Sequence, residues 1–183
     1  MGCSSDRVHQ TARGLAVILA LLAAGTAWYV RPAKPLDLSY VQPDLRGKLT
    51  AMLSTRRPEM VLTGREVNDL LKQALSARPE LHPGVLVTGA AFALQDERLS
   101  ADVNLLVRQR LEAGARLWFK LSWTEPYLTA VHTGTEIRGI SVPLEWFRLD
   151  PLQLDLNADL PKQLRIREVA FEGSTVRLSF NIR

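Results

Sequence analysis

Residues 155–159 carry the polar spacing in this chain that comes nearest to a metal site. Asp155, Asn157 and Asp159 follow the D-x-N-x-D opening of a calcium-binding loop, in which alternate side chains supply oxygen ligands. Such a loop also needs a glycine for its turn and a glutamate for bidentate ligation, but the chain has Leu160 and Ile166 at those positions. Apolar residues alternate with the three polar ones, so an amphipathic strand explains the spacing better. The sequence predicts no bound metal and no cofactor.

The histidines offer little chemistry, because none of them stands near a cysteine or carboxylate at ligand spacing. His9 lies in the N-terminal tail, and His82 and His132 are isolated in the chain. There is no G-x-S-x-G nucleophile motif and no glycine-rich phosphate loop. A chain without a clustered nucleophile, base or metal set is a poor enzyme candidate, and we predict that the protein is not an enzyme.

Apolar side chains on both faces of a predicted sheet suggest a different kind of site. Trp118 falls on the opposite strand face from Phe119 and Trp123, and Trp146 lies in the apolar segment 143–161. One interpretation is a curved sheet that holds a lipophilic ligand or rests on lipid. The other is that helices cover one face and the leucine-rich segment covers the other, and the composition of ordinary cores favours this second interpretation.

Composition restricts the class of protein. Hydrophobic residues make up 46% and charged residues 23% of the chain, which is typical of a folded globular domain. The net charge of +4 is too small and too dispersed for a nucleic-acid-binding surface, so we expect no nucleic-acid partner. Cys3 is the only cysteine, so no disulfide can stabilise the fold.

Residues 14–30 form an apolar run without a charge and predict a transmembrane anchor. As a helix this run spans about 25 Å, near the lower limit for a hydrocarbon core. Trp28 and Tyr29 stand where aromatic rings favour the membrane interface. A cleaved signal peptide with a site at residues 25–27 is the alternative, but the run continues past that site. We expect a single pass with the N-terminus inside and the following domain outside the cytoplasm.

The predicted domain organisation has four parts. A cytoplasmic tail covers residues 1–13, the anchor covers residues 14–30, and a proline-containing extended tether covers residues 31–43. A single extracytoplasmic domain then covers residues 44–183, a usual length for one core.

Two helices should open this domain. Residues 44–56 have apolar side chains at helical spacing. Residues 63–77 form the clearest helix, because Thr63 and Glu66 make a capping box and one face is apolar.

After Gly84 the apolar period changes from 3.6 to 2 residues. Strands are predicted at residues 85–95, 98–108, 115–123 and 127–133, with a further piece at 136–142 and a closing hairpin over 164–182. The predicted fold class is α+β: an N-terminal transmembrane helix, then two helices packed on a largely antiparallel curved sheet of about six strands.

Several short stretches together resemble the YpmS-like family of uncharacterised membrane-anchored bacterial proteins. They are the anchor, Arg31-Pro32, residues 61–63 leading into 66–71, residues 126–128, residues 142–147 and the closing hairpin with Leu160-Pro161. The resemblance covers nearly the whole chain but brings no catalytic residues. The plan of helices followed by a meander also resembles tubular lipid-binding (TULIP-type) domains, which is a likeness of fold alone.

Two functions remain open on this basis. As a binding module, the domain would hold a lipid or another lipophilic component of the cell envelope, in a groove lined by Trp118, Leu106, Leu128 or Trp146. As a structural or interaction protein, it would present a solid domain to envelope partner proteins, with those side chains buried.

Overall fold

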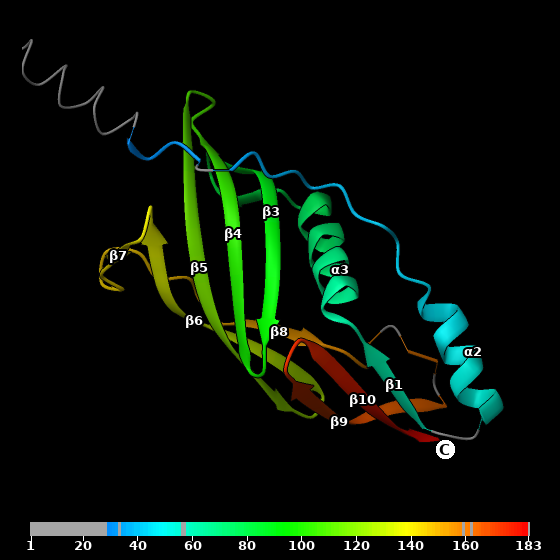
Figure 1. The fold of residues 1–183 in the computed structure, drawn as a ribbon. Helices are drawn as coiled ribbons and strands as arrows, with labels where there is room; N and C mark the ends of the chain where they lie inside the picture. The colour runs from blue at the N-terminus through cyan, green and yellow to red at the C-terminus, as the bar shows by residue number, and fades with distance from the viewer. Residues whose placement is uncertain (1–28, 33, 56–57, 159, 162, 183) are drawn as a thin grey trace, which may run out of the picture.

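The computed structural model describes residues 29–32, 34–55, 58–158, 160–161 and 163–182, and Figure 1 shows the whole arrangement. The described part is α+β, with two helices and ten strands. The elements in chain order are α2 Leu45–Thr55, β1 Glu59–Leu62, α3 Gly64–Ala77, β2 Glu80–His82, β3 Val85–Gln95, β4 Arg98–Val107, β5 Leu111–Thr124, β6 Tyr127–Ile137, β7 Ile140–Val142, β8 Leu152–Asp155, β9 Leu164–Glu172 and β10 Thr175–Ile182.

The strands form two antiparallel sheets. The large sheet has seven strands in the order β2-β3-β4-β5-β6-β7, with β8 also paired to β6. The small sheet has three strands in the order β1-β10-β9. Figure 1 shows the long strands β3, β4 and β5 rising beyond the small sheet, which lies beside their lower ends.

Helix α3 begins where the capping box predicts. The hydroxyl of Thr63 accepts from the backbone N–H of Glu66 at 3.3 Å, and the Glu66 carboxylate accepts from the backbone N–H of Thr63 at 2.9 Å. The ion pair between Lys48 and Glu66, at 2.7 Å, links α2 to this cap. Helix α3 packs against β3, and Asn68 on α3 accepts from the backbone N–H of Phe92 at 2.9 Å. The helix therefore provides a hydrogen-bond partner for a backbone N–H group on the open edge of β3.

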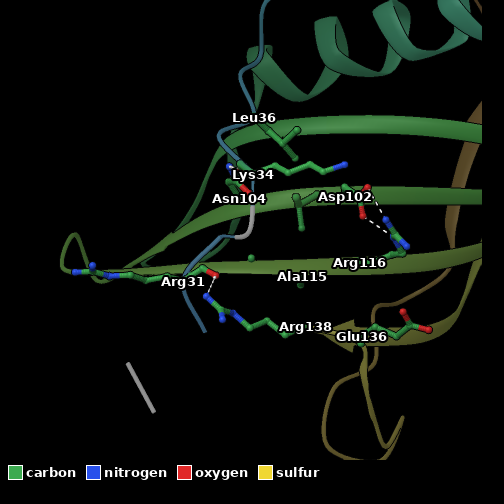
Figure 2. A pocket seen from close by; sticks show the side chains of 12 residues that line it. Arg31, Lys34, Leu36, Asp102, Asn104, Ala115, Arg116, Glu136 and Arg138 are labelled. Carbon is green, nitrogen blue, oxygen red and sulfur yellow. Dashed lines mark hydrogen bonds and ion pairs between the residues drawn. The ribbon is translucent and has the colours of Figure 1, made fainter. Parts of the chain in front are cut away.

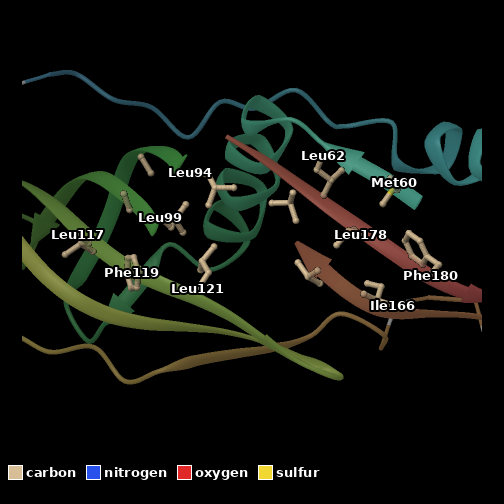
Figure 3. Packing of buried hydrophobic residues seen from close by; sticks show 14 of the residues in the cluster. Met60, Leu62, Leu94, Leu99, Leu117, Phe119, Leu121, Ile166, Leu178 and Phe180 are labelled. Carbon is tan, nitrogen blue, oxygen red and sulfur yellow. The ribbon is translucent and has the colours of Figure 1, made fainter. Parts of the chain in front are cut away.

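The core lies where the large sheet, α3 and the small sheet meet (Figure 3). In β4 and β5 the residues alternate between the core face and the outer face, as the sequence predicts. Val103, Leu117 and Phe119 are buried on the core face. The small sheet contributes Ile166, Val176, Leu178 and Phe180 from the other side, as Figure 3 shows for three of them.

The prediction of a single sheet of about six strands is wrong in one respect. Strand β1 leaves the meander and pairs with β10, so the closing hairpin and β1 form a sheet of their own. The two partners lie more than a hundred residues apart in sequence, as the pair Glu59 and Ser179 shows. Alternation along one strand indicates its buried face but not its partner, which is why the sequence did not reveal this pairing.

The predicted transmembrane anchor at residues 14–30 lies almost entirely outside the described residues, as does the tail at residues 1–13. Among the helices that the structure describes, none is long and apolar enough to cross a bilayer.

Candidate functional site

The predicted tether does not run free, because its first part crosses the outer face of the large sheet. Gly89, Asn104 and Gly114 are cross-strand partners on β3, β4 and β5, so they form one row across the sheet. A Cβ atom at Gly89 would overlap the backbone of Leu36, and one at Gly114 would lie 2.8 Å from Cα of Pro32. The two glycines leave room for a second layer of backbone. We call the described residues of 30–37 the strap (Figure 2).

Hydrogen bonds hold the strap at each strand that it crosses. The backbone N–H of Gly114 donates to the oxygen of Val30 at 2.8 Å, and the side-chain amide of Asn104 donates to the oxygen of Lys34 at 2.9 Å. The backbone N–H of Ala90 donates to the oxygen of Asp37 at 3.1 Å. The domain is therefore held close to the end of the predicted anchor.

A pocket of about 220 Å³ lies between the strap and the outer face of the sheet (Figure 2). Charged side chains line it: Arg31, Lys34, Asp102, Arg116, Glu136 and Arg138. The volume is below that of sites for drug-sized ligands, and none of the four predicted groove residues lines the pocket. This pocket is not the predicted apolar groove.

Trp118 lies on the outer face next to this pocket and does not line it. Its ring is half-buried beneath the guanidinium of Arg116, whose Cζ lies 5.9 Å from the ring centroid. Arg116 in turn makes a forked ion pair with Asp102, with N–O distances of 2.6 and 2.9 Å. The hydrogen bond and charge of Asp102 raise the pKa of Arg116. The Trp118 ring thus packs beneath a surface cation.

The other predicted site residues lie apart from Trp118. Leu106 is half-buried on the outer face, opposite Leu86 and Glu112. Leu128 is half-buried on β6, opposite Trp123 on one side and Leu154 on the other, and so belongs to the core face. The structure therefore does not bring the four predicted residues together in one pocket.

Trp146 has a side chain that is 81% exposed. It lies in the segment 143–151, which runs along the free edge of β6 between β7 and β8. His132 of β6 holds this segment in place. Nδ1 of His132 accepts from the backbone N–H of Leu149 at 3.3 Å, and Nε2 lies 2.9 Å from the hydroxyl of Thr135. The ring of Phe147 packs edge-on against the imidazole, with 5.8 Å between centroids.

The imidazole of His132 is a neutral structural group. Nδ1 accepts a hydrogen bond, so the ring proton lies on Nε2 and is donated to Thr135. Burial lowers the pKa of His132, the nearby charge of Arg148 lowers it further, and a hydrogen bond with the backbone of Gly134 opposes both effects. The ring remains neutral near pH 7 and anchors the segment.

An exposed apolar surface was not predicted at the next strand. Leu152 and Leu154 of β8 are 63% and 59% exposed. They pair with Ala130 and Leu128, and directly opposed residues share one face of a sheet. Both leucines therefore lie on the side of the sheet that faces the core. We call Leu128, Leu152, Leu154 and Trp146 the β8 rim. The sequence prediction that segment 143–161 packs on the sheet holds for Leu149, Leu156 and Leu160, which contact the core, but not for the rim.

The calcium-like motif forms a turn. The Asp155 carboxylate accepts from the backbone N–H of Asn157 at 2.9 Å, and the Asn157 side-chain oxygen accepts from the N–H of Ile166 at 2.8 Å. Two of the motif's side chains thus bond to the protein backbone, while Asp159 lies outside the described residues. In the described part of the chain there is no group of three or more His, Cys, Asp or Glu residues able to hold a metal.

The sequence carries one signal for the strap, in the glycines of the strands beneath it. Glycine weakens a strand interior, so Gly89 and Gly114 within alternating strands indicate that another backbone approaches closely. Exposure of the rim leucines had no comparable signal, because exposed and buried leucines look alike in a sequence.

Comparison with protein-family models, with curated proteins and with solved structures finds no match, and the resemblance to the YpmS-like family stays a prediction.

Proposed function

We propose that the protein is a membrane-anchored extracytoplasmic domain that holds a lipophilic group, such as the acyl chain of an envelope lipid, along the β8 rim. The observation that carries this proposal is the exposure of Leu152 and Leu154 on the core-facing side of the large sheet. Fully burying a leucine stabilises a protein by about 1.5–3 kcal/mol. Burial of these two leucines, which are more than half exposed, would therefore favour the binding of an apolar ligand.

The surroundings of the rim suit a hydrocarbon chain. Leu128 and Ala130 continue the same face inward and are half-buried, so the exposed leucines are continuous with the core. Trp146 adds a large exposed ring in the segment that leads into β8. An acyl chain needs apolar contact and no hydrogen-bond partner, and this surface supplies such contact. The proposed site keeps Leu128 and Trp146 from the sequence prediction and omits Trp118 and Leu106.

Crosslinking of the full-length protein in cells tests this proposal. Cells would be fed a fatty acid that carries a photoactivatable diazirine, and crosslinked peptides of the purified chain would be mapped by mass spectrometry. We expect label on β6 and β8 in addition to residues 14–30, and loss of the β8 label in Leu152→Asp and Leu154→Asp.

Val61→Asp is the matched control, because Val61 is 42% exposed on the small sheet and lies away from the rim. This variant should keep the β8 label. Label that is confined to residues 14–30 in the unmodified chain would contradict the proposal.

A second candidate is that an envelope protein covers the rim. Strand β8 favours this alternative because all four of its residues are exposed and it lies at an edge of the large sheet, where an added strand can pair. A photoreactive phenylalanine analogue at position 146 separates the two candidates. Lipid adducts indicate the first function, and one discrete protein adduct that persists after lipid extraction indicates the second.

A further inference from the structure

Three turns and the start of the strap lie at one end of the large sheet. In an antiparallel meander alternate turns fall at the same end, so the turns at residues 83–84, 108–110 and 138–139 all fall at this end. The register places the turn at 138–139 near the level of Gly114, set back from the tip of the β4–β5 hairpin. The strap starts at this end, where Val30 accepts from Gly114 and the Tyr29 ring lies 5.4 Å from the guanidinium carbon of Arg138. Tyr29 and Val30 are the last residues of the predicted anchor. The predicted membrane span therefore ends against this end of the sheet.

This end carries cations that the protein does not neutralise. In the described part of the chain, ten lysines and arginines make no ion pair, and Arg31, Arg108, Arg110 and Arg138 at this end are four of them. The nearby carboxylates are Glu112, Glu136, Glu80, which accepts from the backbone N–H of Gly84, and Asp102, which pairs with Arg116. Lys34 of the strap adds a further cation. Positive charges outnumber negative ones here, so the end attracts anions.

Exposed apolar side chains stand among these cations. Leu111 follows directly after the turn at residues 108–110 and is 37% exposed, and Ile140 follows the turn at residues 138–139 and is 59% exposed. Exposed apolar tips flanked by arginines are typical of surfaces that lie in the headgroup region of a membrane.

We propose that this end of the domain lies on the anionic lipid surface of the membrane that holds the anchor. Leu111 and Ile140 enter the headgroup region, and Arg31, Arg108, Arg110 and Arg138 bind lipid phosphates. The occupant is the bilayer because the strap's hydrogen bonds keep these side chains next to the point where the chain enters the membrane. This inference rests on the membrane anchoring in the proposed function and is independent of any ligand at the β8 rim.

Spin-label depth measurements on the full chain test this inference. Single cysteines would be introduced at Ile140→Cys and, as a control, Glu97→Cys, each with Cys3→Ala. Glu97 is exposed in the turn at the opposite end of β4, and the register places Ile140 level with about Val103, so the two positions lie about 20 Å apart along the strand. Both proteins would be placed in nanodiscs of equal parts phosphatidylglycerol and phosphatidylcholine, and accessibility to oxygen and to a water-soluble nickel complex would be compared.

We expect the label at position 140 to show the high oxygen and low nickel accessibility of the lipid interface, and the label at position 97 to show water-like accessibility. In phosphatidylcholine alone, or with Arg108→Gln and Arg110→Gln together, position 140 should become at least severalfold more accessible to nickel. Water-like accessibility at position 140 in anionic nanodiscs overturns the inference, and insensitivity to lipid charge overturns the role of the arginines.

Extraction of the native membranes with alkaline carbonate distinguishes the two proposals. A chain that stays in the membrane while position 140 remains in water disproves only the lipid-surface inference. A chain that is released disproves the membrane anchoring as well.

Discussion

The side-chain amide of Asn104 donates a hydrogen bond of 2.9 Å to the backbone oxygen of Lys34, a residue 70 positions earlier in the chain. Asn104 is only 8% exposed, so the contact is shielded from water. It fixes the strap to the middle strand of the three that it crosses. Removing this bond therefore tests directly what the strap contributes to the stability of the domain.

Asn104→Ala should lower the free energy of unfolding by about 1–2 kcal/mol, because it removes a buried hydrogen bond and leaves the Lys34 oxygen without its partner. Urea denaturation followed by tryptophan fluorescence measures the change. Ser100→Ala is the control, since Ser100 lies on the same face of β4 and bonds only to Ala93, at 3.3 Å. An equal loss of unfolding free energy in the two variants would show that the strap contact stabilises the fold no more than the Ser100 hydrogen bond does.

Gly89→Ala should displace the strap, because the added Cβ would overlap the backbone of Leu36. The amide protons of Ala90 and Gly114, which donate to the strap, should then exchange faster with deuterium. Gly134→Ala is the matched control on β6. Its Cβ would lie 3.7 Å from the Trp118 side chain, which is ordinary contact, and exchange at Ala90 and Gly114 should stay unchanged. Unchanged exchange of these two amide protons in Gly89→Ala, relative to the unmodified protein, would refute a docked strap.

Stability should fall on mild acidification because of His132. Its pKa is lowered in the folded state, chiefly by burial, so the unfolded state takes up the proton first. The stability that the neutral ring provides is complete above the ordinary histidine pKa of about 6.5 and is lost as the pH falls below it. The melting temperature should thus drop between pH 7 and pH 5. That window lies above the range in which Asp37, Glu66 and Glu172, whose pKa values are lowered, become protonated.

His132→Gln supplies the control for this pH effect, because glutamine keeps hydrogen-bonding groups but does not titrate. The variant should melt at a lower temperature at pH 7 yet show a smaller drop toward pH 5. An unchanged drop would mean that another group causes the acid sensitivity.

Thr63→Ala should destabilise the protein by about 1 kcal/mol, since the hydroxyl satisfies an otherwise unpaired N–H at the start of α3. Thermal unfolding by circular dichroism measures the effect. Thr50→Ala is the comparison, because Thr50 is exposed within α2 and bonds only to the oxygen of Arg46. A loss in Thr50→Ala as large as in Thr63→Ala would argue against the cap.

Local sequence signals predicted the elements of this fold well. The capping box placed the start of α3, and alternation placed β4 and identified its buried face. These features depend on residues a few positions apart, so their physics can be read in one stretch of sequence.

Long-range relationships could not be predicted in the same way. The pairing of β1 with β10 and the strap's path over Gly89 and Gly114 depend on residues that only the folded chain brings together. The predicted groove failed to assemble for a related reason. Trp118 and Leu128 were both apolar strand residues, but the register places them on opposite faces of the sheet.

The course of the strap has a mechanical consequence. Its bonds to Gly114, Asn104 and Ala90 lie one after another along the chain, so a pull on the N-terminal side loads them in sequence and not together. Each bond that breaks releases a few extended residues, and full release of the strap would add about 25 Å of reach. The strap therefore acts as a short tether that detaches stepwise under tension. The length released at each step is set by the spacing of the three strands that it crosses.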